Sequence, residues 1–193
     1  MAASAESDCS DGLNGHKLKA MTDIILRATA LTADAFAPFG DVIETAGRDS
    51  RWINEETCRR FDDLAQVDVG EAGGRPVLSI FEASPRSLPL RISTLERHPM
   101  SSQAFYPLQA QPFLVVVAPN GPVPDASGIR VFLSSGSQGV NYRRNTWHHS
   151  LIALECKSTF LVVDRGGPGE NCEEMAVNPV VFVTQSNLLK RLY

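Results

Sequence analysis

Apolar residues in this chain fall into short segments that are separated by turn-forming residues. The apolar segments of strand length are residues 77–81, 90–95, 104–108, 113–118, 129–133, 149–154 and 160–164. The stretches between them are rich in Gly, Pro, Ser, Asn and Asp, which supply the backbone dihedrals of turns. The pattern therefore predicts a series of short β-strands joined by tight connections.

Helical signals are confined to short stretches. In the sequence LTADAFAPFG, residues 31–40, Thr32 is a suitable N-cap, and a proline and a glycine end the element. Residues 60–65 also favour a short helix. The C-terminal sequence NLLKRLY, residues 187–193, is compatible either with a last helical turn or with a tail that docks on a partner.

The order of these elements indicates the fold class. Short strands at a spacing of roughly 8–12 residues, without helices long enough to cross over a sheet, pair antiparallel in a sandwich or a barrel. An all-β fold with a few short helices is therefore predicted, and a parallel α/β fold is disfavoured. Residues 21–193 contain no internal repeat and no linker, so we expect them to form a single domain.

The N-terminal residues 1–20, MAASAESDCSDGLNGHKLKA, differ in character from the rest. They are small and polar and lack the apolar region of a secretory signal. We expect them to form a disordered tail, because they offer little apolar surface to bury. The apolar pattern begins only at Met21.

The composition excludes several classes of partner. The chain has 193 residues, of which 43% are hydrophobic and 21% charged, with a net charge of -4. This charge gives no general attraction to nucleic acid or to an anionic membrane, and no apolar run approaches the length that spans a bilayer. We therefore expect a soluble protein whose partner is a small molecule or another protein.

The cysteines indicate a reducing compartment. Cys9, Cys58, Cys156 and Cys172 form no C-x-x-C pair. This spacing argues against both a zinc cluster and a disulfide framework, so we expect free thiols in a cytoplasmic protein.

The histidines are the main clue to chemistry. The chain has four, and those outside the N-terminal tail are His98, His148 and His149. They lie in two polar segments that border predicted strands. A small β-barrel holds a ligand in its mouth between neighbouring strands, so the two segments can converge there although they are distant in sequence.

Strand alternation separates the adjacent histidines. In an extended strand, Trp147 and His149 point to one face. His148 then points to the other face, together with Ser150 and Ile152. We expect His148 to line the pocket and Trp147 to pack between sheets. The alternative is that the adjacent pair is one satisfied core histidine and one surface histidine.

The segments LERHPMSSQAFYPL, PFLVVVA, GVNYRRNTWHHSL and FLVVDRGG give the chain a resemblance to the ureidoglycolate lyase family, over residues 31–172. The resemblance implies a cupin-like antiparallel β-barrel of the double-stranded β-helix type, usually a homodimer. It also implies a lyase that cleaves (S)-ureidoglycolate to glyoxylate and urea in allantoin degradation, and nickel is associated with some members. The chain differs from the family pattern at Glu56 and Asp62, where members often carry glycine and histidine.

The implied reaction calls for proton transfer. Ureidoglycolate carries a hydroxyl and a ureido nitrogen on one carbon, so its lysis needs a base for the hydroxyl proton and an acid for the departing nitrogen. Histidine serves either role near neutral pH, which makes His98 and His148 the catalytic candidates. Glu96 shares a strand face with His98, and it either orients that ring, acts as the base, or is a plain surface glutamate.

A metal would use some of the same side chains. A divalent ion, nickel or another, would bind the substrate hydroxyl and lower its pKa. The candidate ligands are His98, Gln103 and His148.

The substrate itself requires further groups. Arg144 and Arg165 are candidates for the carboxylate, because a guanidinium matches it bidentately. Asn141 and Tyr142 are candidates for the ureido group, although Tyr142 is also compatible with a role as a rim aromatic. Gln103 is a further candidate for substrate binding.

Two other functions are compatible with the same residues. One is a metal-dependent cupin enzyme that acts on another small hydroxy acid or a sugar, and the other is a non-catalytic cupin that binds a small ligand. For a ureidoglycolate lyase, the expected partners are the small-molecule substrate and a second copy of the chain.

Overall fold

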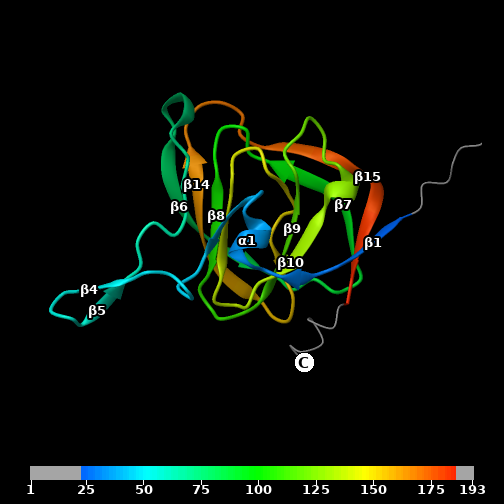
Figure 1. The fold of residues 1–193 in the computed structure, drawn as a ribbon. Helices are drawn as coiled ribbons and strands as arrows, with labels where there is room; N and C mark the ends of the chain where they lie inside the picture. The colour runs from blue at the N-terminus through cyan, green and yellow to red at the C-terminus, as the bar shows by residue number, and fades with distance from the viewer. Residues whose placement is uncertain (1–22, 186–193) are drawn as a thin grey trace, which may run out of the picture.

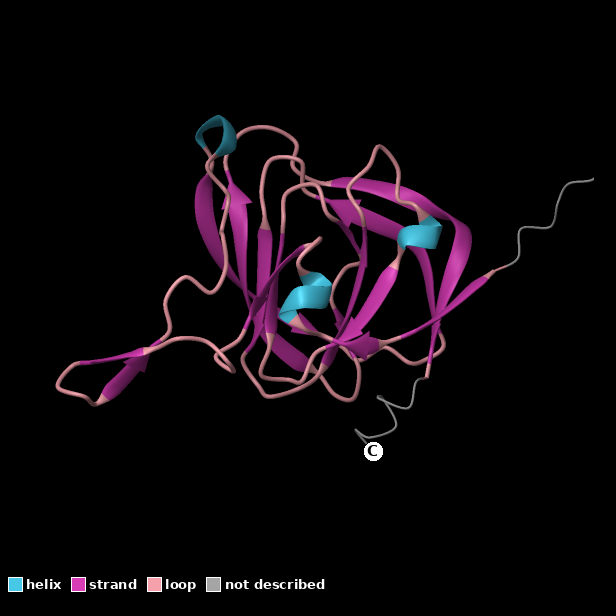
Figure 2. Ribbon diagram, in the orientation of Figure 1, coloured by secondary structure: helices cyan, strands magenta, loops and turns pink. Residues whose placement is uncertain are grey.

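The computed structural model describes residues 23–185 and shows an all-β molecule with a few short helices, as predicted (Figure 1, Figure 2). Its strands form two large sheets and a separate hairpin. The eight-stranded sheet contains, in spatial order, β1 (Ile24–Arg27), β15 (Glu173–Thr184), β7 (Leu90–Arg97), β12 (Trp147–His148), β9 (Phe113–Ala118), β10 (Arg130–Leu133) and β2 (Thr29–Ala30), with β13 (Ile152–Ala153) also paired to β9.

The second sheet is antiparallel throughout. Its five strands, in spatial order, are β3 (Gly40–Ile43), β11 (Gly139–Tyr142), β8 (Gln103–Pro107), β14 (Ser158–Gly166) and β6 (Arg75–Ala83). The hairpin consists of β4 (Arg51–Ile53) and β5 (Cys58–Arg60), and the short helices are α1 (Ala33–Phe36), η1 (Glu71–Gly73) and η2 (Ala126–Gly128). The eight-stranded sheet curls until β1 approaches β10, which gives the nearly closed, barrel-like form expected of a cupin-like fold.

Two hydrophobic clusters fill the fold, one on each face of β9. Leu114 and Val116 point into the cluster inside the curled sheet. Val115 and Val117 point the other way, into the cluster between the two sheets. Because alternate side chains face opposite sides of a strand, β9 is buried on both faces, which explains its continuous apolar sequence.

The strand predictions are confirmed in place but not in number, because the described residues form fifteen strands and the apolar pattern marked seven segments. Each predicted apolar segment overlaps a strand, and residues 77–81 and 160–164 lie inside the longer β6 and β14. The main omission is β15, which contains a register shift between Ala176 and Val181. Its apolar run, residues 180–183, follows a proline near the C-terminus and was overlooked.

The segment 149–154 is not the continuous strand that was predicted. β12 ends at His148, and β13 begins at Ile152. Trp147 and Ile152 are five residues apart, whereas their partners on β9 are four apart, so one extra residue is inserted on this side. Such a β-bulge reverses the alternation, and Ile152 therefore packs in the same cluster as Trp147 instead of sharing the face of His148.

The helix predictions divide. α1 begins as expected, since the Oγ1 of Thr32 accepts a hydrogen bond from the N–H of Ala35 at 3.3 Å. The helix predicted for residues 60–65 is wrong, because Arg60 pairs with Arg51 in the hairpin and the residues that follow form neither helix nor strand. The predictions for residues 1–20 and 187–193 lie outside the described residues. Within the described range, no helix is long and apolar enough to cross a membrane.

Candidate active site

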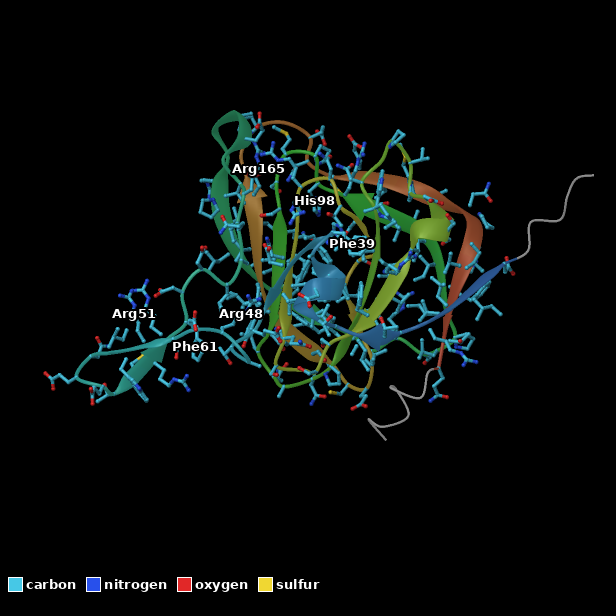
Figure 3. The ribbon with its side chains drawn as sticks, viewed as in Figure 1. Phe39, Arg48, Arg51, Phe61, His98 and Arg165 are labelled. Carbon is cyan, nitrogen blue, oxygen red and sulfur yellow. The ribbon has the colours of Figure 1, made fainter. Side chains whose placement is uncertain are left out.

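A cavity of about 590 Å³ opens between the two sheets. Its lining residues are Phe81, Glu82, Ala83, Glu96, His98, Gln103, Phe105, Ser150 and Leu151. Glu96 lies on β7 of the eight-stranded sheet, Gln103 lies on β8 of the five-stranded sheet, and His98 lies in the connection between them (Figure 3). The two histidine-bearing segments therefore meet at this cavity, as the sequence analysis expected.

Sheet register brings Glu96 and His148 together. β12 lies between β7 and β9, and His148 is directly opposite Glu96 in the antiparallel pair. Residues in opposite positions project from the same face, so their side chains meet. The Nε2 atom of His148 lies 3.5 Å from a carboxylate oxygen of Glu96.

The imidazole of His148 is buried and fixed on three sides. Its Nδ1 lies 2.9 Å from the carbonyl oxygen of Thr146, which can only accept, so Nδ1 carries a proton. Nε2 is then a lone-pair donor in the neutral ring, and it lies 3.2 Å from Oε1 of Gln103. The ring of Tyr142 stacks on His148, with the centroids 4.2 Å apart and the planes at 15°. These contacts aim Nε2 at the cavity lining.

His98 presents the same atom from the other side. Its Nδ1 donates to the carbonyl oxygen of Asn171 at 2.6 Å. Its Nε2 is buried and has no hydrogen-bond partner among the described residues. The ring centroids of His98 and His148 are 5.1 Å apart, so the structure brings the two predicted histidines together.

Gln103 is oriented by a residue that the sequence did not single out. Its amide nitrogen donates to the carboxylate of Asp164 at 2.7 Å. This bond fixes which end of the amide is which. A carboxylate can only accept, and the nitrogen is the only end of the amide that can donate. The amide oxygen of Gln103 is therefore the end that faces His148.

The convergent atoms fit a metal ion. One ligand atom each of Glu96, His98 and His148 lies within 4.8 Å of the others. In the neutral rings these atoms, together with the oxygen of Gln103, are all acceptors with no hydrogen to share. A divalent cation with nitrogen and oxygen ligands, or an added proton, resolves this excess of lone pairs. The set includes Glu96, which the sequence-based ligand set lacked.

The carboxyl group of Glu96 is ionised at neutral pH. When Nε2 of His148 also carries a proton, its hydrogen bond holds the pKa of Glu96 below the usual value, and positive charge on the neighbouring histidines acts in the same direction against the effect of burial. Glu96 is therefore an acceptor or a metal ligand in the folded protein rather than a proton donor.

Asn141 and Tyr142 lie behind the cavity lining. The amide nitrogen of Asn141 donates to Asp41 at 2.9 Å and to the carbonyl oxygen of Gln66 at 3.0 Å. Tyr142 is 4% exposed, so it is not the rim aromatic considered as its alternative role. Burial raises the pKa of Tyr142 far above its ordinary value, which keeps the phenol neutral. The structure places Tyr142 as a support for His148.

The two arginines predicted to bind the substrate carboxylate both contact the segment 68–71 instead. Arg144 forms ion pairs with Asp68 at 3.0 Å and Glu71 at 3.1 Å. Arg165 donates to the carbonyl oxygen of Glu71 at 2.7 Å. Neither lines the cavity between the sheets. Arg165 borders a neighbouring hollow that it shares with His98 and Asn171, on the side of the Nδ1 atom of His98.

Trp147 and His149 lie outside the cavity. Trp147 is fully buried, as its predicted packing role requires, but it lies in the cluster inside the curled sheet and not between the two sheets, and its indole nitrogen donates to the carbonyl oxygen of Gly121 at 3.0 Å. The Nδ1 of His149 lies 2.8 Å from the carbonyl oxygen of Ser150, and burial lowers its pKa. Of the adjacent histidines, only His148 joins the cluster with Glu96 and His98.

Sequence reasoning missed the residues that position the cluster. Thr146 and Asn171 act through backbone carbonyl groups, which every residue possesses, so no sequence signal marks them. Asp164 ends the predicted strand 160–164, and its place after a buried run was the one available signal. The aromatic wall formed by Phe81 and Phe105 likewise follows from strand pairing rather than from a motif.

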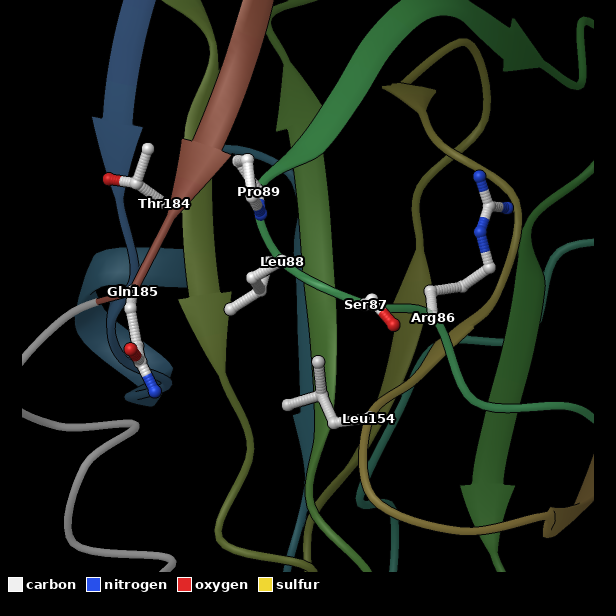
Figure 4. Close-up of a pocket in the computed structure, with 7 residues that line it drawn as sticks. All are labelled: Arg86, Ser87, Leu88, Pro89, Leu154, Thr184 and Gln185. Atoms are coloured by element: carbon white, nitrogen blue, oxygen red, sulfur yellow. The ribbon is translucent and has the colours of Figure 1, made fainter.

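A second hollow, of about 400 Å³, is shown in Figure 4. Its lining residues are Arg86, Ser87, Leu88, Pro89, Leu154, Thr184 and Gln185. Among its described lining residues, Arg86 is the one ionisable side chain, and they include no group of converging ligands. The cavity at His98 is therefore the better candidate for catalysis.

Comparison with known proteins shows which family the chain resembles. The family model described as ureidoglycolate lyase matches residues 23–184. The chain is 54% identical to the ureidoglycolate lyase of Burkholderia mallei (strain NCTC 10229) over 159 residues, which cover 82% of this chain and 93% of the relative. It is 53% identical to the ureidoglycolate lyase of Pseudomonas aeruginosa (strain LESB58) over 149 residues, which cover 77% of this chain and 88% of that relative.

Proposed function

The chain belongs to the ureidoglycolate lyase family, and we propose that it cleaves (S)-ureidoglycolate to glyoxylate and urea in the cavity between its two sheets. Family membership makes it a lyase. The observation that carries the location of the site is the convergence of Glu96, His98 and His148 at that cavity.

The reaction is an elimination that consumes no water. The substrate hydroxyl gives up its proton, and the electrons of the O–H bond form the carbonyl group of glyoxylate. The electrons of the C–N bond leave with the ureido nitrogen, which takes up a proton and departs as urea. The site must accept one proton, deliver one proton and hold the substrate carboxylate.

Glu96, His98 and His148 are proposed to hold a divalent ion such as nickel, with the amide oxygen of Gln103 as a further ligand. Such an ion supplies positive charge that lowers the pKa of the substrate hydroxyl. The unpartnered, buried Nε2 of His98 supports this proposal, because an isolated buried polar atom is otherwise unfavourable. The carbonyl groups bonded to each Nδ1 hold both Nε2 atoms in place as ligands.

Without a metal, the same atoms are suited to proton transfer. His98 lines the cavity, whereas His148 is buried behind it, so the Nε2 of His98 is the atom nearer to a bound hydroxyl group. The ionised carboxylate of Glu96 would stabilise the imidazolium that forms. The same proton can then pass to the ureido nitrogen, which balances the reaction.

The cavity wall serves to exclude water and orient the substrate. Phe81, Phe105 and Leu151 give it an apolar surface, and the hydroxyl of Ser150 adds one polar group at the edge. Removing water strengthens every charge interaction of the substrate with Glu96 and the histidines.

The test is glyoxylate release from racemic ureidoglycolate by the purified full-length protein, compared with the spontaneous rate. The assay is run as isolated, after chelation and after nickel is restored. Activity lost on chelation and regained with nickel supports the metal-bound form, whereas activity unaffected by chelation supports proton transfer by His98. For substitutions of His98 and His148 in the same assay, His149→Gln is the matched control, because His149 is the adjacent histidine outside the cluster.

Release no faster than the spontaneous rate in all three conditions would refute the proposed function. Tight retention of iron or manganese by such an inactive protein would instead favour a metal-dependent cupin enzyme acting on another small hydroxy acid. A protein that binds glyoxylate without turnover would favour the non-catalytic alternative.

The assembly is proposed to be a homodimer in the cytoplasm. The cysteines in the described range, Cys58, Cys156 and Cys172, are free, which supports a reducing compartment. Exposed apolar side chains on β6 support self-association, which sedimentation measures directly.

A further inference from the structure

The cavity lacks a positively charged side chain of its own. No arginine or lysine is among the described residues that line it, and its ionisable lining groups are Glu82, Glu96 and His98. The proposed substrate is a carboxylate anion, which an ionised Glu96 repels. The inference that follows rests on the proposed function, since it concerns how this anion is held.

Three positively charged side chains outside the cavity already have hydrogen-bond or ion-pair partners. Arg144 is held by Asp68 and Glu71, and Arg165 by backbone carbonyl groups. Lys157 pairs with Glu82 at 2.7 Å. Moving any of these three cations to the substrate breaks an existing contact, so none of them is a ready partner for the carboxylate.

An unengaged cation lies on the hairpin of β4 and β5, which projects from the body of the molecule as an arm (Figure 1). Arg51 and Arg60 share the carboxylate of Asp62. Arg59 forms no ion pair among the described residues and donates only to the hydroxyl of Ser50, at 2.7 Å. It is the free positive charge of the arm.

Aromatic rings flank this guanidinium. The Cζ of Arg59 lies 5.9 Å from the ring centroid of Trp52 and 5.0 Å from that of Phe61. Trp52 is 59% exposed, although it is a residue that usually buries its ring. An exposed cluster of tryptophan, arginine and phenylalanine has the composition of an interface hot spot.

The arm has little to stabilise it within one copy. β4 and β5 pair through three residues each, and a two-stranded hairpin by itself is marginal in water. Its turn holds Asn54, Glu55 and Glu56 at positive φ, a conformation that is unfavourable for a residue such as glutamate. Packing against another surface would offset this cost.

A matching surface surrounds the cavity. β6 is the edge strand of its sheet, and it exposes Leu78, Ile80 and Phe81. Phe81 also lines the cavity, next to the acidic Glu82 and not far from Glu96. The cavity mouth is therefore apolar, with the carboxylate of Glu96 inside it, which suits the exposed aromatic rings of the arm and the guanidinium of Arg59.

We propose that the arm of one copy of the chain packs on a second copy at the β6 edge and places Arg59 at the mouth of its cavity, where the guanidinium binds the substrate carboxylate. Each active site is then completed by residues of two chains. In a symmetric dimer the arrangement is reciprocal, because the same patch serves both copies.

The test is a mixing experiment with two defective variants. His148→Ala removes the cluster in one chain, and Arg59→Ala removes the cation of the arm in the other. Arg59→Ala alone should lower kcat/KM roughly tenfold to hundredfold, mainly through KM, because it removes a charge-assisted contact. After the two variants are unfolded and refolded together in equal amounts, activity should rise to about one quarter of that of the wild type, since random pairing gives that fraction of intact sites.

Sedimentation measures the contact independently of catalysis. Trp52→Ala should shift the wild-type protein from dimer toward monomer, whereas Arg91→Ala, at an exposed arginine on β7, should not. A monomeric wild type, a mixture no more active than its parts, or an Arg59→Ala protein with wild-type kcat/KM would each overturn the proposal. Absence of lyase activity in the wild type refutes the proposed function instead, and the sedimentation result still decides whether the arm joins two copies.

Discussion

His148 lies directly opposite Glu96 across the β7 and β12 pair, with its Nε2 atom 3.5 Å from the carboxylate. This relationship joins a buried imidazole to a group that faces the cavity. It also explains why only one of the two adjacent histidines joins the cluster with Glu96 and His98, because the Nδ1 of His149 lies instead against the carbonyl oxygen of Ser150. The following predictions depend on this geometry.

Replacing Glu96 with glutamine tests the charge of the cluster. Glu96→Gln preserves size but removes the negative charge that balances His98 and His148 or a bound cation. We expect kcat/KM to fall roughly hundredfold or more, and nickel bound per chain after dialysis to fall with it. Glu173→Gln, an exposed glutamate paired with Arg97, is the matched control and should retain both properties. Normal activity of Glu96→Gln would contradict a role for its charge.

Two replacements of His98 distinguish the roles of its two ring nitrogens. Asparagine can keep the hydrogen bond to the carbonyl oxygen of Asn171 but has no atom at the position of Nε2. His98→Asn should therefore unfold at nearly the wild-type temperature while kcat/KM falls roughly hundredfold or more. His98→Ala should lose both activity and some stability, since it also leaves that carbonyl group unpaired. Comparable activity in His98→Asn and the wild type would show that Nε2 is not used.

Asp164 is expected to act only through Gln103. Asp164→Asn allows the Gln103 amide to turn, because asparagine can donate as well as accept. We expect kcat/KM to fall roughly tenfold and metal retention to weaken, with the fold intact by circular dichroism. Asp164→Asn combined with Gln103→Ala should be no worse than Gln103→Ala alone. An additive loss in the double variant would show an independent role for Asp164.

Tyr142 is expected to support His148 by its ring and not by its hydroxyl. Tyr142→Phe keeps the stacked ring, so kcat/KM should stay within about twofold of the wild type. Tyr142→Leu removes the stack and should lower both stability, by about 1–3 kcal/mol, and activity. These effects are measured by chemical denaturation and by glyoxylate release. A large loss in Tyr142→Phe would restore the earlier hypothesis that the phenol binds the ureido group.

Much of the fold could be predicted because apolar side chains reveal a local period. Residues 113–118 form a continuous apolar run, and the structure buries both faces of that strand. The error at residues 149–154 has a physical cause, since a single inserted residue reverses the alternation and leaves no mark in composition. The error at 60–65 arose because a hairpin can form from polar residues when cross-strand pairs satisfy the backbone.

The sequence alone determined that this chain is an all-β protein, and it pointed to two histidine-bearing segments as the candidate site, because strand periodicity, turn residues and motif order are local properties. Only the tertiary structure decided which atoms meet. Strand register placed Glu96 against His148, and backbone carbonyl groups selected Nε2 of each ring as the free atom. The tertiary structure also pairs Arg144 with Asp68 and Arg165 with the carbonyl oxygen of Glu71, away from the cavity. Such contacts join residues far apart in the chain, and their geometry depends on the packing of whole sheets.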